Sequence, residues 1–147
     1  MLNKIVLASK SKVRKKILQE NEIECTIEPS NVDEDSVKEA LLKEKASPEE
    51  ISKNLAELKA NRISNKKVDE LVLGADSVID LNGKIISKPI NRNEALEILR
   101  DLNGQTHHLI SSVCISQNGS MIWNYTDKAS LTMKQMKEEE LKVYLSK

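Results

Sequence analysis

Strand and helix signals alternate along the whole chain of 147 residues, and this alternation limits the folds that it can adopt. The short apolar run at residues 5–7 is typical of a buried strand, residues 23–28 predict a second strand, and Ser11 is placed to cap a helix between them. Ser47-Pro48-Glu49-Glu50 is a capping box with proline at the first helical position, so we expect a helix from there to about residue 64. Mixed strands and helices at these intervals predict an α/β layer fold.

Two Asn-Gly dipeptides predict tight hairpins in the second half of the chain, because both central residues of a type I′ turn need positive φ. The four strands expected beside them are residues 71–80 and 84–87 around Asn82-Gly83, and residues 107–117 and 120–133 around Asn118-Gly119. Between the hairpins, Asn91 with Glu94 three residues later predicts a helix, which Asn103-Gly104 ends. Asn21 is predicted to end the first helix in the left-handed conformation.

The last helix signal begins at Glu138, and the chain stops at Lys147 without a C-cap or a returning strand. We therefore expect one domain over residues 1–147 that lacks its C-terminal strands. The hairpin at 107–133 would then keep open edges, and the last helix would have little to pack against. This predicts aggregation, or rescue by oligomerisation, with a homodimer as the candidate assembly.

Composition and charge restrict the partners of the chain. It has 23 basic and 23 acidic side chains and a formal net charge of zero, which argues against a surface that binds polyanions generally. Only Trp123, Tyr125 and Tyr144 could stack on bases, so an RNA-binding module is disfavoured and no nucleic-acid partner is expected. Phenylalanine is absent, so Leu, Ile and Val must fill the core.

No feature directs the chain to a membrane or to an oxidising compartment. No apolar run approaches the roughly 18 residues of a membrane span, and the N-terminal segment has too few apolar residues for a signal peptide. Cys25 and Cys114 have no CxxC partner and no nearby histidine, so we interpret them as two reduced thiols. The sequence thus predicts a cytoplasmic protein with no membrane partner.

Asp76 is the first candidate for chemistry. It lies in the apolar run 71–80, where a carboxylate costs free energy unless it is paired, hydrogen-bonded or metal-bound. Gly74 beside it would let a second backbone or a ligand come close. The alternative interpretation ends the strand at Leu73 and places Asp76 in an Asx-type turn.

The second candidate is the junction where the first strand runs directly into a helix. Free N–H groups and the helix dipole make such a junction an anion site, and Ser9, Ser11 and Arg14 would strengthen it. The junction lacks the glycines of a phosphate-binding loop, so the pattern alone is weak. The alternative is a capped helix with solvated basic residues.

Other charged residues are ambiguous when each is considered singly. Asp33-Glu34, in a predicted loop after Pro29, could bind a divalent metal through oxygen or could be a solvated acidic pair. Lys59 lies on a helix face where snorkelling is the alternative, and Lys88-Pro89 follows a hairpin strand. His107-His108 has no cysteine or histidine at metal-ligand spacing, so we interpret these residues as strand-end or substrate-contacting groups.

Taken together, these residues form six motifs that follow one another in order along the chain. The motifs are Leu7-Ala8-Ser9-x-Ser11-x-x-Arg14, Asp33-Glu34, Leu55-Ala56-x-x-Lys59-Ala60, Gly74-Ala75-Asp76-Ser77-Val78, Lys88-Pro89 and Gly104-x-Thr106-His107. Their combination resembles the Maf family of nucleoside triphosphate pyrophosphatases. The resemblance implies an elongated mixed-sheet α/β fold with two lobes around a nucleotide cleft, similar to inosine triphosphate pyrophosphatases.

The resemblance also implies a house-cleaning hydrolase, which cleaves the α–β phosphoanhydride of modified or non-standard nucleotides with a divalent cation (Mg²⁺ or Mn²⁺). In the motifs, Asp76 matches the catalytic proton acceptor, and Glu34 matches the acid of the metal and phosphate site, so that these two carboxylates would hold the metal. The groups that would grip the triphosphate are Ser9, Arg14, Lys59 and Lys88. A non-catalytic nucleotide-binding regulator of cell division is the alternative function.

Two departures from the family pattern concern base selection. Val13 stands where the family often has the first arginine of Ser-Pro-Arg-Arg, and Ser77 stands where it has threonine. The aliphatic side chain of Val13 would offer no hydrogen-bond donor to pyrimidine carbonyls, whereas a larger purine would gain contact area against it. The expected substrate is therefore of the 7-methyl-GTP type, in preference to dTTP or UTP.

Overall fold

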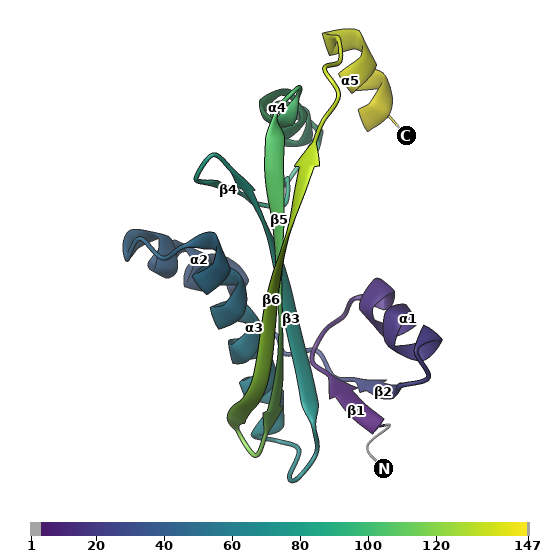
Figure 1. Ribbon diagram of the computed structural model, residues 1–147, viewed down its shortest axis with the longest axis vertical. Helices are drawn as coiled ribbons and strands as arrows, with labels where there is room; N and C mark the ends of the chain where they lie inside the picture. The colour runs from purple at the N-terminus through teal and green to yellow at the C-terminus, as the bar shows by residue number, and fades with distance from the viewer. Residues whose placement is uncertain (1–3, 147) are drawn as a thin grey trace. The chain divides into compact units, whose positions relative to one another are not determined.

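The computed structural model describes residues 4–146, which form a six-stranded mixed sheet and five helices (Figure 1). The strands are β1 (Lys4–Leu7), β2 (Glu24–Ile27), β3 (Val72–Leu81), β4 (Lys84–Ile86), β5 (Thr106–Gln117) and β6 (Ser120–Thr132). The helices are α1 (Lys12–Glu20), α2 (Glu34–Lys43), α3 (Pro48–Ser64), α4 (Arg92–Leu102) and α5 (Glu138–Leu145). Within residues 4–146, none of these helices is long and apolar enough to cross a membrane. The predicted α/β class is confirmed.

The chain divides into two compact units, which are described separately below. The first unit holds the chain up to Ser77 together with Ser111–Asp127, and the second holds Val78–Ile110 together with the chain from Lys128 onward. The sheet has the strand order β2-β1-β3-β5-β6, and β4 pairs with β3. Strands β3, β5 and β6 therefore contribute residues to both units.

In the first unit, the short strand β1 lies between two parallel neighbours. Leu7 is opposite Ile27 of β2 on one side and opposite Leu73 of β3 on the other. This register brings the residues after β1 next to the middle of β3. The predicted cap of α1 is confirmed, because Ser11 Oγ accepts a hydrogen bond from the backbone N–H of Arg14 at 3.2 Å.

Two local predictions near the first helices were wrong. Asn21 ends α1 with φ −99°, and the left-handed residue is its neighbour Glu22, with φ 60°. The predicted loop at Glu34 is instead the first residue of α2. Asp33 caps this helix, because its carboxylate accepts the backbone N–H of Ser36 at 3.2 Å and the Ser36 hydroxyl at 2.8 Å. Val37, Ala40 and Leu41 follow helical spacing in this segment, but none of the residues of α2 is buried.

Helix α3 begins at the predicted capping box and packs closely against β3. A Cβ added at Gly74 would lie 2.8 Å from the backbone N of Ala60, and closer still to the carbonyl oxygen of Ala56. Only glycine lets the two backbones approach this far, so the predicted close approach at Gly74 is confirmed. Strand β3 continues through Asp76 to Leu81, so the Asx-turn alternative was wrong.

The interface between α3 and β5 is more polar than we expected from a core of Leu, Ile and Val. In the first unit, the fully buried side chains of β5 are Ser112, Cys114 and Ser116. Ser112 Oγ lies 2.7 Å from Ser52 Oγ of α3, and Ser116 Oγ donates to the Asn61 side chain at 2.5 Å. These small side chains let α3 lie close to the sheet while their hydroxyl groups stay hydrogen-bonded.

The second unit has its own small core, one predicted turn and one predicted helix cap. Leu81, Ile86 and Leu102 form a buried cluster, against which Ile79, Ile98 and Met133 pack. Asn82 and Gly83 have φ of 50° and 91°, which confirms the type I′ signal between β3 and β4. Asn91 caps α4 by accepting the backbone N–H of Glu94 at 2.9 Å, as predicted.

The prediction that the last helix has little to pack against was wrong. Leu141 of α5 is 1% exposed, and α5 packs against α4. Arg100 of α4 forms an ion pair with Glu138, and Asn103 forms two reciprocal hydrogen bonds of 2.8 Å with the backbone of Met136. The segment before α5 is therefore attached to α4 by both apolar and polar contacts.

Candidate active site

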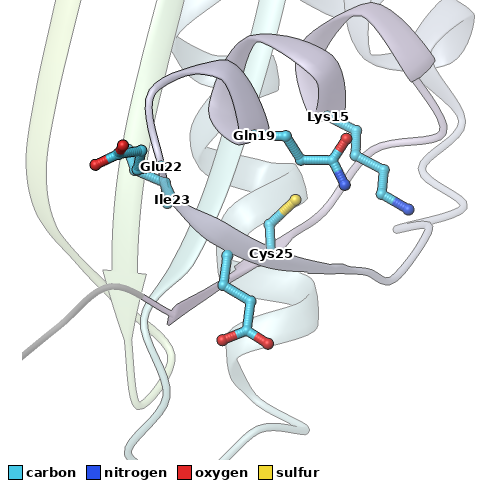
Figure 2. A pocket seen from close by; sticks show the side chains of 6 residues that line it. Lys15, Gln19, Glu22, Ile23 and Cys25 are labelled. Carbon is cyan, nitrogen blue, oxygen red and sulfur yellow. The ribbon is translucent and has the colours of Figure 1, made fainter.

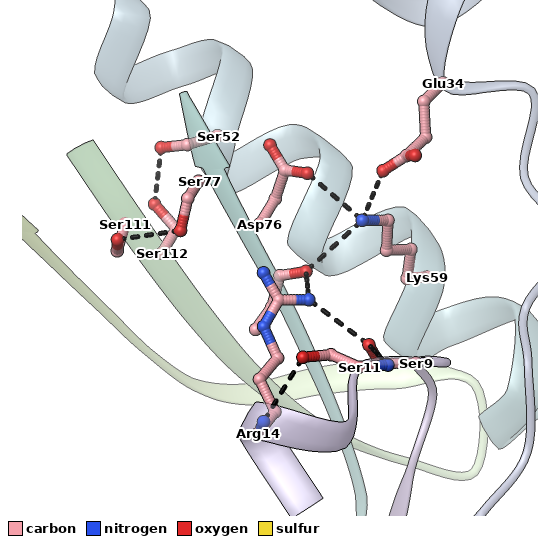
Figure 3. Close-up of polar contacts among 11 residues, drawn as sticks. Ser9, Ser11, Arg14, Glu34, Ser52, Lys59, Asp76, Ser77, Ser111 and Ser112 are labelled. Carbon is pink, nitrogen blue, oxygen red and sulfur yellow. Dashed lines mark hydrogen bonds and ion pairs between the residues drawn. The ribbon is translucent and has the colours of Figure 1, made fainter. Parts of the chain in front are cut away.

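Four segments of the first unit bring the predicted site residues together (Figure 3). Asp76 lies on β3, Lys59 on α3 and Glu34 at the start of α2, while Ser9 and Arg14 come from the β1–α1 junction. The side chains of Asp76 and Glu34 both point toward the ammonium group of Lys59. The structure therefore gathers five of the eight residues predicted for the site into one polar cluster.

Lys59 is the centre of this cluster. Its residue is only 9% exposed, because it projects from the buried face of α3 toward β3. Its Nζ donates to Asp76 Oδ1 at 3.1 Å and to the carbonyl oxygen of Ala75 at 3.3 Å, and it forms an ion pair with Glu34. Snorkelling toward solvent was thus the wrong interpretation of Lys59, because its charged end is the buried part.

Asp76 is held in an environment that disfavours its charged form. It is 6% exposed, and burial raises its pKa above the usual range, while the charge and hydrogen bond of Lys59 oppose this rise. Asp76 Oδ1 is bound to Lys59, whereas Oδ2 is buried with no hydrogen-bond partner among the described residues. A buried carboxylate oxygen without a partner is uncommon in native proteins, and it often marks a place where a water or ligand binds.

Glu34 differs from Asp76 both in its exposure and in the direction of its pKa shift. Its side chain is 44% exposed. Partial burial acts to raise its pKa, but the hydrogen bond and charge of Lys59, together with a hydrogen bond to Asp76 and the charge of Lys38, outweigh that effect, so its pKa lies below the usual value. Two carboxyl groups that share one lysine therefore have pKa values displaced in opposite directions, a pattern often found in active sites.

Asp33 caps helix α2 and so sets the position of Glu34. The Asp33 carboxylate is occupied by Ser36 at the N-terminus of α2, and this hydrogen bonding lowers its pKa. Because the cap sets where the helix begins, Glu34 takes the first helical position, from which it reaches Lys59. The two residues of the predicted acidic pair therefore make different contacts: Asp33 binds Ser36, and Glu34 binds Lys59.

Arg14 and Ser9 connect the β1–α1 junction to the same part of β3. Arg14 Nη1 donates to Ser9 Oγ at 3.3 Å and to the carbonyl oxygen of Ala75 at 3.2 Å. Ser9 Oγ also accepts the backbone N–H of Ser11 at 3.1 Å. The Ala75 carbonyl therefore receives one hydrogen bond from Arg14 and one from Lys59, so two cations lie beside Asp76.

Three predicted residues lie outside this cluster. Lys88 is exposed in the segment between β4 and α4 of the second unit. Val13 is 68% exposed on α1. Ser77 Oγ lies 2.8 Å from Ser111 Oγ, and both residues belong to the first unit. The roles predicted for these residues remain predictions.

Lys38 is a further charged residue of the site, and the sequence motifs did not indicate it. Its positive charge lowers the pKa of Glu34 and of Asp76, so it contributes to the field of the site. The spacing of Glu34 and Lys38, four residues apart, could have indicated this pair if α2 had been predicted as a helix.

His107 also has a polar atom that lacks a protein partner. Its Nδ1 is buried without a hydrogen-bond partner among the described residues.

The carboxylate oxygens of Glu34 and Asp76 suit a divalent cation that is also bound by a substrate. Within residues 4–146, no group of three or more His, Cys, Asp or Glu side chains could hold a metal by itself. Mg²⁺, however, is commonly held by one or two carboxylates together with substrate phosphates. Glu34 and Asp76 supply two carboxylates, and the buried Oδ2 of Asp76 has no hydrogen-bond partner within residues 4–146. The residues therefore fit such a cation.

A hollow elsewhere in the first unit does not share this chemistry. It has a volume of about 460 Å³ and lies between α1 and β2 (Figure 2). Its lining includes Lys15 but also Glu22 and Glu24, and it contains none of the predicted site residues. A lining with more acidic than basic groups does not favour a polyphosphate.

Comparisons with known proteins show the family to which the chain belongs. Residues 4–147 match the family of Maf-like proteins. This chain belongs to the Maf family. It is 73% identical over 147 residues to a nucleoside triphosphate pyrophosphatase of Pelagibacter ubique, covering all of this chain and 75% of that protein. It is 38% identical over 143 residues to a protein of the same name from Ruegeria pomeroyi, covering 97% of this chain and 72% of that protein.

The fold of this Maf-family chain also resembles a solved structure. The HAM1 protein from Coxiella burnetii matches with a TM-score of 0.55 and 17% sequence identity, covering 88% of this chain and 71% of that chain. At this identity, the similarity concerns the fold alone. It agrees with the mixed α/β architecture predicted for this member of the Maf family.

Proposed function

We propose that the protein is a nucleoside triphosphate pyrophosphatase, which hydrolyses the α–β phosphoanhydride to a nucleoside monophosphate and pyrophosphate. The observation that carries the proposal is the buried Asp76, whose Oδ1 is held by Lys59 and whose Oδ2 has no hydrogen-bond partner in the part of the chain that the structure describes. The names of the related proteins from Pelagibacter ubique and Ruegeria pomeroyi support the same activity.

Asp76 is proposed as the general base. Its Oδ1 is fixed by Lys59, so Oδ2 is the atom that can accept a proton from the attacking water. Burial raises its pKa, which makes it a stronger proton acceptor than an exposed carboxylate. In-line attack on a phosphoryl group requires a positioned nucleophile, and the rigid strand β3 supplies that position.

Lys59, Arg14 and Ser9 are proposed to bind the phosphates. Lys59 and Arg14 both lie at the Ala75 carbonyl, so two positive charges converge beside the proposed base. Cationic donors stabilise the charge that develops on phosphoryl oxygens and on the leaving pyrophosphate. Lys88 is proposed as a further phosphate ligand on the ground of its motif alone, and the nucleotide cleft that the family resemblance implies belongs to this proposal as well.

Glu34 and Asp76 are proposed to hold a divalent cation, Mg²⁺ or Mn²⁺. When bound, such a cation neutralises phosphate charge and orients the phosphates for cleavage. The partly exposed carboxylate of Glu34 is the main oxygen ligand proposed for it, and Asp76 would contribute through its carboxylate. A cytoplasmic location and a single Maf-like domain complete the proposal.

The proposed substrate is a modified purine nucleotide of the 7-methyl-GTP type. Val13 is largely exposed and offers an apolar surface without hydrogen-bond donors. Pyrimidine carbonyls against such a surface would lose hydrogen bonds to water, at a cost of about 1–3 kcal/mol for each unmet acceptor. Comparing kcat/KM for 7-methyl-GTP, GTP, dTTP and UTP tests this specificity, and a tenfold preference for dTTP or UTP would contradict it.

Replacing Asp76 with asparagine tests the catalytic proposal. The change keeps the shape of the side chain but removes proton acceptance, so we expect kcat to fall roughly 10²–10⁴-fold while nucleotide binding persists. Product analysis should show pyrophosphate and a nucleoside monophosphate from the parent protein. Asp35→Asn, on the exposed side of α2, is the matched control. Nucleotide binding by a parent protein that hydrolyses none of the panel would favour a non-catalytic regulator instead.

A further inference from the structure

We propose that Glu34 is a specificity residue, which acts as an internal competitor of phosphate at Lys59 and so selects against polyphosphates that bring no divalent cation. The inference rests on the proposed function, because it assumes that substrate phosphates bind Lys59. It concerns the step before catalysis, namely which form of a polyphosphate can enter the site.

The hydrogen-bond capacity of Lys59 is the first reason. An ammonium group has three N–H donors and no acceptor. In the structure, Nζ has three acceptors: the Ala75 carbonyl at 3.3 Å, Asp76 Oδ1 at 3.1 Å and Glu34 Oε1. A phosphate oxygen can therefore receive a hydrogen bond from Lys59 only if one of these acceptors leaves.

The mobility of the three acceptors is the second reason. The Ala75 carbonyl belongs to the backbone of β3, and Asp76 is 6% exposed on the same strand, so both are fixed by the sheet. Glu34 is the first residue of α2, and its side chain is 44% exposed. Rotation of the Glu34 side chain into solvent breaks its contacts with Lys59 and Asp76, whereas displacement of Asp76 or Ala75 would distort β3.

The charge balance of the site is the third reason. Lys59, Arg14 and Lys38 bring three positive charges to the site, and Glu34 and Asp76 carry two negative charges when ionised. A metal-free polyphosphate would have to displace Glu34 and would then lie beside a free carboxylate, which repels it. A polyphosphate that arrives with a divalent cation gives this carboxylate a new partner, so release from Lys59 costs less.

Binding of inorganic tripolyphosphate, measured by isothermal titration calorimetry with EDTA or with Mg²⁺, tests the inference without any turnover. We expect Glu34→Gln to bind metal-free tripolyphosphate roughly tenfold or more tightly than the parent, because the variant loses the competing charge. In saturating Mg²⁺ this advantage should shrink or reverse. The matched control is Glu39→Gln, which removes one exposed carboxylate from the same helix, where it pairs with Lys43.

The outcomes separate this inference from the proposed function. Equal metal-free affinities of Glu34→Gln and Glu39→Gln, or no binding by either, would overturn the competition at Lys59. Hydrolysis of nucleoside triphosphates by the parent, measured in parallel, addresses the proposed function. An active parent whose Glu34→Gln variant gains no metal-free affinity refutes only the inference, whereas an inactive parent whose variant gains affinity refutes only the function.

Discussion

Lys59 determines the electrostatics of the site because it is the buried cation between two acidic groups. Its position follows from packing, since it lies on the face of α3 that contacts β3. Removal of one member of a buried charge set leaves the others without compensation, which is more costly than the loss of a surface ion pair. The opposite displacements of the Asp76 and Glu34 pKa values follow from their different burial around this one lysine.

Asp33 allows a prediction at the level of one titrating residue. Its carboxylate accepts two hydrogen bonds from Ser36, which lower its pKa, so its folded-state pKa lies below the unfolded value. The resulting stabilisation is fully present above the unfolded pKa and is lost as pH falls through the folded pKa. Asp33→Ala should therefore lower Tm at neutral pH, and its difference from the parent should shrink in acid.

Thermal unfolding of the parent, Asp33→Ala and Asp33→Ser between neutral and acid pH measures this effect. Serine keeps a capping oxygen but has no titrating group, so its deficit in Tm should be smaller at neutral pH. A deficit of Asp33→Ala that stays constant across the acid range would show that the carboxylate charge contributes nothing to the cap.

The contact between β3 and α3 is the decisive feature at the level of elements. Asp76 and Lys59 come from these two elements, and Gly74 sets the distance between them. We expect Gly74→Ala to cost about 1–3 kcal/mol of unfolding free energy, because the added methyl group would collide with the backbone of α3 at Ala56 and Ala60. The same displacement should move Lys59 away from Asp76 and lower kcat/KM.

Gly83→Ala is the matched control for this prediction. Gly83 has φ 91° in the exposed β3–β4 turn, and a Cβ added there meets nothing within 4 Å. Gly83→Ala should therefore lower the free energy of unfolding through backbone strain, while kcat/KM stays near that of the parent. Chemical denaturation and steady-state kinetics on both variants provide the comparison, and equal losses of kcat/KM would contradict the special role of the α3–β3 contact.

For the whole molecule, β6 is the feature most relevant to assembly. In the sheet formed by the described residues, β6 is the last strand in the order and pairs with β5. Its side chains include the exposed Ile122 and the stacked pair Trp123 and Tyr125, whose ring centroids are 6.5 Å apart. Residues 120–126 of β6 carry no charge, and edge segments without protecting charges favour association with another strand, so we expect concentration-dependent self-association.

Ile122→Lys should reduce this association, because a charge on an edge strand disfavours pairing. Light scattering coupled to size-exclusion chromatography over a range of concentrations measures it. Val68→Lys, which places the same charge at a 76% exposed apolar position in the loop before β3, is the control. A monomeric parent at every concentration would contradict the expected oligomerisation.

Local chemistry in the sequence was sufficient to predict most of the elements and the family. Capping residues such as Ser11, Ser47 and Asn91, and the Asn-Gly turns, specify structure through contacts a few residues apart, so they can be read from a linear pattern. Helix α2 was missed because residues 34–43 follow Pro29 in a segment interpreted as a loop, although Val37, Ala40 and Leu41 stand at helical spacing. The docking of α5 on α4 was missed because it depends on contacts distant in sequence, such as Arg100 with Glu138.

The chemistry of the site needed the tertiary structure. The motifs named Asp76, Glu34 and Lys59 separately, but nothing in their spacing shows that one ammonium group serves both carboxylates and the Ala75 carbonyl. Burial raises the pKa of Asp76 and the ion pair with Lys59 lowers that of Glu34, and both effects arise only when β3, α3 and α2 pack together. Residue identity is a property of the chain, whereas desolvation and charge pairing are properties of the packed structure.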